Sequence, residues 1–565
     1  MRLLPTKPIR LPRLRPYVPS PEDPAIFWFN SERDDIVSEV SRRMVEAHAS
    51  SRGALEQALN ETAFQETQRL RSQRGEEARE SLGFWYGLLR RIARMTDEEK
   101  RETLQRIADR MAKDVAGNFD PRVYALSEKV VPRLLTAAMN PKGLGRAVLQ
   151  PHDRIDQLLE VEGHVEKLRR LVRVATLVFV PTHLSNLDSV VLGYSLMRAG
   201  LPPVVYGAGK NLFTNPIISF FMHNLGAYRV DRRIRAALYK EALKTYSCVM
   251  IERGYHSLFF PGGTRSRSGA IESKLKLGLA GTAVEAFARN QLRGIDRPVL
   301  LVPTTINYEL VLEGETLIAE HLEEEGKARY IIEDDEFSRL DRWLAFLQQL
   351  LGLKSGCIIR FGDPVDPFGN PVDDDGRSLS PRGEQVEAAS YVSRSGKPSL
   401  DPSRDMAYTR HLGEVLVDRF RRETVLMSTQ LVAHALYRRL VRCTPGVDVF
   451  GRIRHRGDVS MPRRELVQEI GAARDALLSL ERQGRVHMSS ILRSEPPDVI
   501  VDRALRAFVG YHVRNAALDV GAEVTAEDPT LLLFYQNRVV PFAEEIADEP
   551  NMKAAREIAR MGGLR

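Results

Sequence analysis

The chain lacks several features that would each define a class of protein. Its 565 residues include 3 cysteines, which are too scattered for a disulfide framework or a Cys-x-x-Cys metal site. No apolar run reaches the length of about eighteen residues that a membrane-spanning helix needs. The start of the chain alternates Arg and Pro and has no continuous apolar core, so it does not resemble a secretory signal. We therefore expect a protein of a reducing compartment, without a metal or other cofactor.

Positive charge is in slight excess. The chain has 82 Lys and Arg residues against 75 Asp and Glu residues, a formal net charge of +7. Such an excess favours an anionic partner, which could be a phospholipid surface, coenzyme A, an acidic carrier protein or a nucleic acid. The length and the 43% hydrophobic content are enough for two or three hydrophobic cores.

Composition and hydrophobic periodicity divide the chain into segments of different character. They are an extended Pro- and Arg-rich N-terminus at 1–30, a helical bundle at 31–150, an α/β domain at 151–366, an irregular linker at 367–404 and a mainly helical domain at 405–565. In the α/β segment, short apolar runs typical of buried strands alternate with helical stretches. We therefore predict the α/β class, with a central domain of mixed sheet and surrounding helices between two helical parts.

A histidine and an aspartate stand five residues apart just after one such apolar run. Residues 171–180 predict a buried strand that ends at Pro181, and a helix is expected to start between 185 and 188. His183 would then lie in the loop and Asp188 at the helix start. The ends of strands are where α/β proteins commonly place their sites. The alternative is that His183 and Asp188 merely cap a helix.

This pair has the chemistry of a general base. A neutral imidazole, with an unperturbed pKa of about 6.5, can take a proton from a hydroxyl group that attacks a carbonyl. Asp188 could hold the other ring nitrogen and stabilise the imidazolium, as the acid of a serine-hydrolase triad does. The nucleophile would be a hydroxyl of the substrate, which makes the reaction an acyl transfer, and N–H groups of nearby loops would stabilise the oxyanion.

A basic, glycine-containing loop further along suggests a phosphate site. Residues 264–267, Thr-Arg-Ser-Arg, follow a Pro-Gly-Gly turn. Glycines allow backbone N–H groups to approach an anion, and arginines present planar forks to phosphate oxygens. The residues expected to serve this site are Arg232, Gly263, Arg265, Ser266, Arg267, Lys274 and Lys276. The alternative is an ordinary solvated basic loop.

These segments and two others occur in the order and spacing of the sequence blocks of the glycerolipid acyltransferases. The blocks are 179–188, 226–232, 259–269 and 300–307. The chain resembles that superfamily, and specifically its bacterial membrane-associated glycerol-3-phosphate acyltransferases. The resemblance covers about 174–307, and a weaker likeness continues at 358–364, 428–433 and 533–537.

The resemblance implies a function and roles for residues. It implies transfer of a fatty acyl group from acyl-CoA or acyl carrier protein to the sn-1 hydroxyl of glycerol-3-phosphate, by an enzyme bound peripherally to the cytoplasmic face of the membrane through anionic lipid. The arginines at the positions of Arg232 and Arg265 bind glycerol-3-phosphate in that family, and the proline at Pro303 binds the acyl donor or shapes the site. The alternatives are a lysophosphatidate or other phospholipid acyltransferase, and a catalytically inactive lipid-binding relative.

Two positions depart from the family pattern. Gly262 stands where the third block usually has a glutamate, and Arg229 stands where the second block usually has an aromatic residue. Neither change touches the proposed base pair. Both put the identity of the acceptor in question.

Two further segments predict contacts with other partners. Residues 211–222 combine bulky apolar side chains with a proline and nearby basic residues, which suits either insertion into a membrane interface or core packing. Residues 461–470 and 476–488 resemble a winged helix-turn-helix, although glutamates interleave their arginines. We therefore expect no nucleic-acid partner, and a packing or lid role for the C-terminal part.

Overall fold

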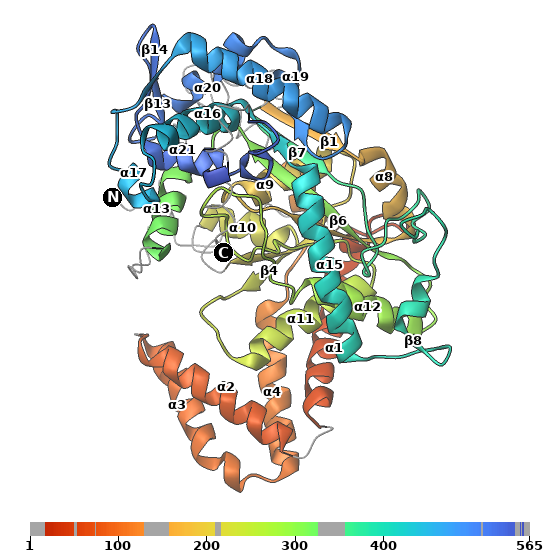
Figure 1. Ribbon diagram of the computed structural model, residues 1–565. Coiled ribbons are helices and arrows are strands. Elements are labelled where there is room, and N and C mark those ends of the chain that lie inside the picture. Colours follow the sequence, from red (N-terminus) through yellow and green to blue (C-terminus); the bar gives the residue numbers. More distant parts are fainter. Residues whose placement is uncertain are drawn as a thin grey trace.

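The computed structural model of the protein describes most of the chain. The described residues are 17–49, 53–73, 75–128, 158–209, 216–325, 356–509, 512–547, 554 and 556–558. Most of the extended N-terminus, the end of the predicted helical bundle and the first half of the 211–222 segment lie outside them. Figure 1 shows the N-terminal helices at the bottom, a central sheet with its helices in the middle, and the C-terminal helices at the top.

A seven-stranded mixed sheet forms the centre of the molecule. Its strands are β1 (Leu159–Gly163), β2 (Thr176–Pro181), β3 (Val205–Gly209), β4 (Ala227–Val230), β5 (Ser257–Leu258), β6 (Val299–Tyr308) and β7 (Cys357–Phe361). Their order is β1-β7-β6-β2-β5-β3-β4. β7 runs antiparallel to β6, and the other neighbours are parallel. The prediction of an α/β class with a mixed sheet is confirmed.

One predicted strand begins later than the sequence suggested. Residues 171–174 belong to helix α8 (Val165–Val174), and the strand starts at Thr176. Leu168 and Leu171 are both fully buried, three residues apart on one face of α8. The β-branched residues after Leu171 favoured a strand, but packing of this amphipathic face decides for a helix.

Helices surround the sheet and connect its strands. They are α9 (Asp188–Arg198), α10 (Pro216–Asn224), α11 (Ala237–Glu252), α12 (Ala280–Leu292) and α13 (Gly314–Glu325). α9 starts at Asp188, as predicted. β2 and β6 are buried along their whole length in the middle of the sheet, so their C-terminal ends provide a rigid base for the loops that follow.

The N-terminal part is helical. It contains η1 (Ala25–Trp28), α1 (Phe29–Ala49), α2 (Ala54–Arg71), α3 (Glu76–Arg91), η2 (Ile92–Arg94) and α4 (Asp97–Val115). Ile36, Val40 and Met44, which recur at four-residue intervals, are fully buried in α1. α1 and α4 pack on each other and on α11. α2 and α3 project furthest from the sheet (Figure 1).

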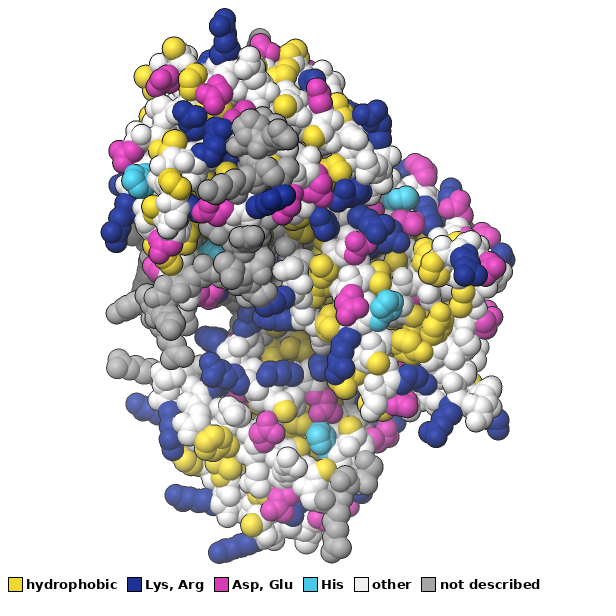
Figure 2. Space-filling model, viewed as in Figure 1, with side chains coloured by type: hydrophobic (Ala, Val, Ile, Leu, Met, Phe, Trp, Pro, Cys, Tyr) yellow, Lys and Arg dark blue, Asp and Glu magenta, His cyan; other side chains and the backbone are white. Residues whose placement is uncertain are grey.

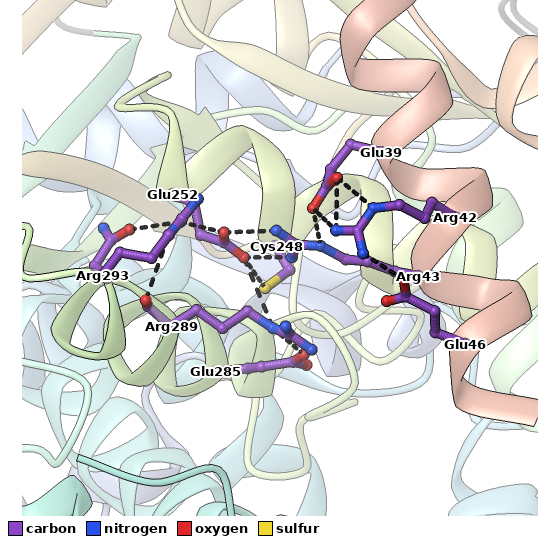
Figure 3. Close-up of polar contacts among 10 residues, drawn as sticks. Glu39, Arg42, Arg43, Glu46, Cys248, Glu252, Glu285, Arg289 and Arg293 are labelled. Atoms are coloured by element: carbon purple, nitrogen blue, oxygen red, sulfur yellow. Dashed lines mark hydrogen bonds and ion pairs between the residues drawn. The ribbon is translucent and has the colours of Figure 1, made fainter. Parts of the chain in front are cut away.

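A buried glutamate joins this part to the sheet domain. Glu252, at the end of α11 and 1% exposed in its side chain, accepts hydrogen bonds of 2.6 and 2.8 Å from Arg43 of α1. Arg293, directly after α12, also pairs with Glu252, and the sulfur of Cys248 lies 3.1 Å from the Glu252 carboxylate (Figure 3). A cavity of about 390 Å³ lies beside this network. The charged side chains that line this cavity are paired with one another, as expected where two parts of a fold are joined.

The C-terminal part packs over the sheet. Its long helices are α15 (Pro402–Glu423), α16 (Ser428–Cys443), α18 (Arg463–Arg482) and α20 (Pro497–Phe508), and its shorter ones are α17 (Val449–Arg452), α19 (Ser490–Ser494) and α21 (Pro529–Gln536). The short strands are β10 (Val425–Leu426) paired with β12 (His487–Met488), and β11 (Ser460–Pro462), β13 (Ala517–Asp519) and β14 (Glu523–Ala526) in a sheet of their own. The linker before α15 has η6 (Ala388–Val392), the strand pair β8 (Ser393–Arg394) and β9 (Lys397–Pro398), isolated β-bridges and turns.

The predicted helix-turn-helix is wrong. The two stretches that suggested separate helices, 461–470 and 476–488, lie largely in the single continuous helix α18. The residues between the stretches contain no proline, and Ala473 packs into the core with Ile470 and Leu477, which continues the buried face.

The described helices also bear on membrane contact. In the described ranges, no helix is long and apolar enough to cross a bilayer. The 211–222 segment is described only from Pro216 as the start of α10, and its side chains only from 219 onward. Its membrane-insertion prediction therefore lies mostly outside the described residues.

Candidate active site

The histidine and the aspartate singled out in the sequence form a direct pair. His183 lies in the loop after β2, and its Nδ1 is 2.7 Å from Oδ2 of Asp188 at the start of α9. Asp188 is completely buried, whereas 13% of the His183 side chain is exposed. The other ring nitrogen, Nε2, makes no hydrogen bond within the described part of the chain. The pair therefore offers one ring nitrogen to a substrate while the carboxylate holds the other.

Four donors hold the Asp188 carboxylate. Oδ2 accepts the backbone N–H groups of Leu184 at 2.6 Å and Ser185 at 3.0 Å as well as contacting His183, and Oδ1 accepts the hydroxyl of Tyr308 at 2.8 Å. Burial, followed by the Asp188 charge, raises the pKa of Tyr308 well above its usual range, so its hydroxyl stays protonated and donates. Sequence analysis missed Tyr308, which comes from the end of β6.

Two contacts fix the His183 ring from outside the pair. The ring stacks on Phe260, with centroids 4.2 Å apart and an interplanar angle of 27°. The backbone oxygen of His183 accepts the N–H of Ser266 at 2.7 Å. The first and third sequence blocks are therefore joined at the histidine, and the basic loop lies beside the base.

A second buried carboxylate, that of Glu313, also holds the loop. Glu313 accepts hydrogen bonds from the Ser185 hydroxyl at 2.8 Å and the Asn186 N–H at 2.9 Å, and it pairs with Arg265 at 3.1 Å. Burial raises its pKa, and the Arg265 charge opposes that shift. Sequence analysis missed Glu313. The available signal was an acidic residue that directly follows the apolar run 310–312.

The arginines of the second and third blocks, Arg232 and Arg265, lie within electrostatic reach of each other. Arg265 is partly exposed, and Arg232 keeps an exposed surface. Partial burial lowers the pKa of the Arg232 guanidinium, and the Arg265 charge lowers it further, so the two cations lie close enough to repel each other. Arg232 makes no ion pair within the described residues. Two neighbouring cations, one of them unpaired, can bind an anion.

Lys276 lies along the glycine turn of the same loop. Its Nζ is 2.9 Å from the position that a Cβ on Gly263 would occupy, and Gly263 has a φ of +71°. A side chain at 263 would therefore clash with Lys276 and strain the backbone. The side chain of Lys276 is exposed, so its ammonium can add positive charge at this turn.

Other predicted residues have partners within the protein. Arg267 points to α13, where it pairs with Glu320 at 3.1 Å and with Glu324. The Ser266 hydroxyl donates to the backbone oxygen of Ala270 at 2.8 Å and so closes the turn. These contacts give Arg267 and Ser266 structural roles, and their binding of substrate stays a prediction.

Pro303 lies beside the strand that carries the histidine. It is buried in β6 directly opposite Val180 of β2, and its carbonyl oxygen accepts the N–H of Gly362 at 2.7 Å. Val180 stands three residues before His183 in the chain, so Pro303 lies near the start of the His183 loop. Binding of an acyl donor by Pro303 stays a prediction.

Most loop amides near the base are already used. The N–H groups of Leu184 and Ser185 donate to Asp188, and that of Asn186 donates to Glu313, so they are not free for an oxyanion. The N–H groups of Thr264 and Arg265 make no hydrogen bond with any residue that the structure describes. The described ranges contain no group of three or more His, Cys, Asp or Glu side chains that could hold a metal ion.

The comparisons with known proteins agree with this geometry. Residues 162–307 match the family model described as Acyltransferase. A glycerol-3-phosphate acyltransferase of Aeromonas hydrophila is 32% identical over 209 residues, which are 37% of this chain and 24% of that protein. The protein of the same name from Pseudomonas aeruginosa is 33% identical over 159 residues, 28% of this chain and 18% of its own length. The chain thus matches about a quarter or less of the length of these relatives.

A solved structure is also similar. The 1-acyl-sn-glycerophosphate acyltransferase PlsC of Thermotoga maritima has 17% identity and a TM-score of 0.22, with coverage of 42% of this chain and 86% of that protein. A TM-score this low gives no basis for transferring structural detail. The family match itself spans β2, the His183 loop, both arginine blocks and most of β6. The similarity to acyltransferases therefore lies in the central part of this chain, residues 162–307.

Proposed function

We propose that this protein transfers a fatty acyl group from an acyl thioester to the sn-1 hydroxyl of glycerol-3-phosphate, which yields lysophosphatidic acid. The observation that carries the proposal is the convergence of two features at one place. The His183–Asp188 pair is joined, through the Ser266 N–H, to the loop that carries Arg265, whose charge acts on Arg232. A base beside a pair of cations suits a substrate that has both a hydroxyl and a phosphate.

The reaction follows from the orientation of the imidazole. Nε2 of His183 takes the proton of the sn-1 hydroxyl as its oxygen attacks the thioester carbonyl, and the buried Asp188 stabilises the imidazolium. The tetrahedral intermediate collapses with cleavage of the C–S bond, and the imidazolium returns the proton to the thiolate. The products are an ester and a free thiol. The unused N–H groups of Thr264 and Arg265 are the candidates for oxyanion donors.

The phosphate end of the acceptor is assigned to the cations of the second and third blocks. An arginine fork gives a phosphate both charge and direction, so the pair would orient the hydroxyl toward His183 as well as bind the substrate. Lys276 would add charge from the glycine turn. Glu313 holds Arg265 in place at 3.1 Å before the substrate arrives.

The donor and the location are parts of the same proposal. Acyl-CoA and acyl carrier protein are both anionic thioester donors, and a protein with a net charge of +7 attracts either of them. Lys and Arg side chains gather around the hollow above the N-terminal helices in Figure 2. The same positive charge suits peripheral binding to anionic lipid on the cytoplasmic face of the membrane.

A product assay with the purified chain tests the function. Palmitoyl-CoA and palmitoyl-acyl carrier protein are each offered with glycerol-3-phosphate, lysophosphatidate and glycerol, and the lipid products are separated. We expect lysophosphatidic acid from glycerol-3-phosphate, and a loss of about 10²–10⁴-fold in His183→Ala with an unchanged melting temperature. Acylation of lysophosphatidate alone would make the protein a lysophosphatidate acyltransferase, and no product with any pair would indicate an inactive lipid-binding relative. Flotation with anionic and neutral vesicles tests the membrane contact separately.

A further inference from the structure

The third block lacks the carboxylate that its family usually carries, and the structure shows what lies in that space. A Cβ built on Gly262 would lie 3.6 Å from Cγ of Glu272 and 3.2 Å from the backbone oxygen of Thr264. The first distance is an ordinary van der Waals contact. The side chain of Glu272, ten residues further along the chain, therefore lies next to the place where a side chain at 262 would begin.

Glu272 contacts the catalytic loop directly. Its Oε1 accepts the backbone N–H of His183 at 2.6 Å, and its side chain is 7% exposed. Its other oxygen, Oε2, is buried and makes no hydrogen bond within the described part of the chain. Burial raises the pKa of this carboxyl, and the charge of Arg538 opposes the shift. A buried, half-satisfied carboxylate is costly, so one used at a catalytic histidine needs an explanation.

A buried arginine from the C-terminal part faces the free oxygen. Nη1 of Arg538 is 4.0 Å from Oε2 of Glu272, and the arginine side chain is 2% exposed. Its Nη2 donates to the backbone oxygen of Ile306 at 3.1 Å, and the charges of Glu272 and Asp188 oppose the lowering of the Arg538 pKa by burial. The preceding Asn537 donates to the backbone oxygen of Ser268 in the basic loop at 2.9 Å. The C-terminal segment is thus fastened to the third and fourth blocks around the base.

We propose that Glu272 replaces the carboxylate missing at position 262, and that together with Arg538 it positions the loop that carries His183. This inference rests on the proposed acyl transfer for its kinetic consequence only. Glu272 acts through the His183 backbone and is a positioning residue, because no part of it reaches Nε2. The same arrangement explains why glycine suits position 262, since a second carboxylate there would share one buried space with Glu272.

Exchange of the carboxylate between the two positions tests the replacement. The variants are Glu272→Ala, Glu272→Gln, Gly262→Glu and the double variant Gly262→Glu/Glu272→Ala, with Gly262→Ala as the control for a side chain without charge. Melting temperature, kcat and both KM values are measured for each. The melting temperature does not depend on the identity of the substrate, so it tests the replacement even if the proposed function fails.

The expected pattern is specific. Gly262→Glu should lower the melting temperature more than Gly262→Ala in the wild-type background, and it should raise the melting temperature when Glu272 is alanine. Glu272→Ala should lower kcat about a hundredfold, as a small displacement of a base can, with little change in either KM. Glu272→Gln, which keeps an acceptor for the His183 N–H, should recover part of kcat, and the double variant should exceed Glu272→Ala.

Two results would overturn the inference. Independent, additive effects of the two substitutions on melting temperature would mean that the positions do not share one role. A wild-type kcat in Glu272→Ala would mean that the loop needs no carboxylate there. Failure of the proposed function has a different signature, since the wild-type chain would then form no lysophosphatidic acid with either donor.

Discussion

Asparagine at position 188 would remove the charge of the buried carboxylate while keeping its shape. Oδ2 of Asp188 accepts from His183, Leu184 and Ser185, and Oδ1 accepts from Tyr308. An asparagine can keep its oxygen toward the three donors of Oδ2 and turn its amide nitrogen to the Tyr308 hydroxyl, which can accept as well as donate. The loop and the His183 tautomer should therefore survive the substitution.

The expected loss comes from the charge alone. An imidazolium and a carboxylate with charge centres about 4 Å apart attract each other by about 4 kcal/mol at an effective dielectric constant near 20. This attraction exists only after His183 has taken the proton, so its removal raises the barrier by about the same amount. At about 1.4 kcal/mol for each factor of ten, kcat should fall about a thousandfold. The free energy of unfolding should change by only about 1–2 kcal/mol, because two effects oppose each other. Charge-assisted hydrogen bonds become weaker neutral ones, but the cost of burying a charge disappears.

The assay compares Asp188→Asn with Tyr308→Phe. The second variant removes one hydrogen bond from the same carboxylate but keeps its charge, so its kcat should stay within about tenfold of wild type, since one neutral hydrogen bond contributes about 1 kcal/mol. Acyl transfer and urea unfolding are measured on both. A kcat near wild type in Asp188→Asn would refute the charge argument. An unfolded Asp188→Asn protein would show that the aspartate is mainly a structural cap.

Three further predictions concern binding, stability and pH. Arg265→Ala should raise the KM for glycerol-3-phosphate far more than that for the thioester, with partial recovery in Arg265→Lys, and equal changes in both would contradict a phosphate role. Since Arg265→Ala also unpairs the buried Glu313, adding Glu313→Gln should recover melting temperature but not KM. Glu252→Ala should lower the free energy of unfolding by about 3–5 kcal/mol in urea titration, because it breaks the buried ion pair at the junction and leaves Arg43 with its pair to Glu39, and a loss below about 1 kcal/mol would contradict this. Burial lowers the pKa of His256 to about 3, so the fold keeps it neutral and loses stability as pH falls from 6.5 toward that value. At pH 5 the loss should be about 2 kcal/mol, and in unfolding curves at pH 7 and pH 5 it should be absent from His256→Asn.

Local sequence was enough for the base pair and for most strands. Residues 179–188 run from a strand end to a helix start. Because the loop between them is short, His183 and Asp188 lie close enough to form a hydrogen bond. The predicted strand at 171–180 began too early, because β-branched residues suit a strand but the buried face of Leu168 and Leu171 suits a helix. The sequence pattern at 461–488 suggested two helices with a turn between them, but the structure has the single helix α18 there. In both cases the local sequence allowed two secondary structures, and tertiary packing selected one of them.

By itself the sequence determined the chemistry that is available: a histidine five residues before an aspartate, a basic turn with two glycines, and a missing carboxylate at Gly262. Only the tertiary structure decided which groups complete the site. Glu272, Tyr308 and Glu313 lie 89, 125 and 130 positions after His183 in the chain, and the pairing of β2 with β5 and β6 brings them to the loop from His183 to Asp188. A buried carboxylate without hydrogen-bond donors lowers the stability of the fold. The donors lie far from the carboxylates in the sequence, so only the folded chain brings them together.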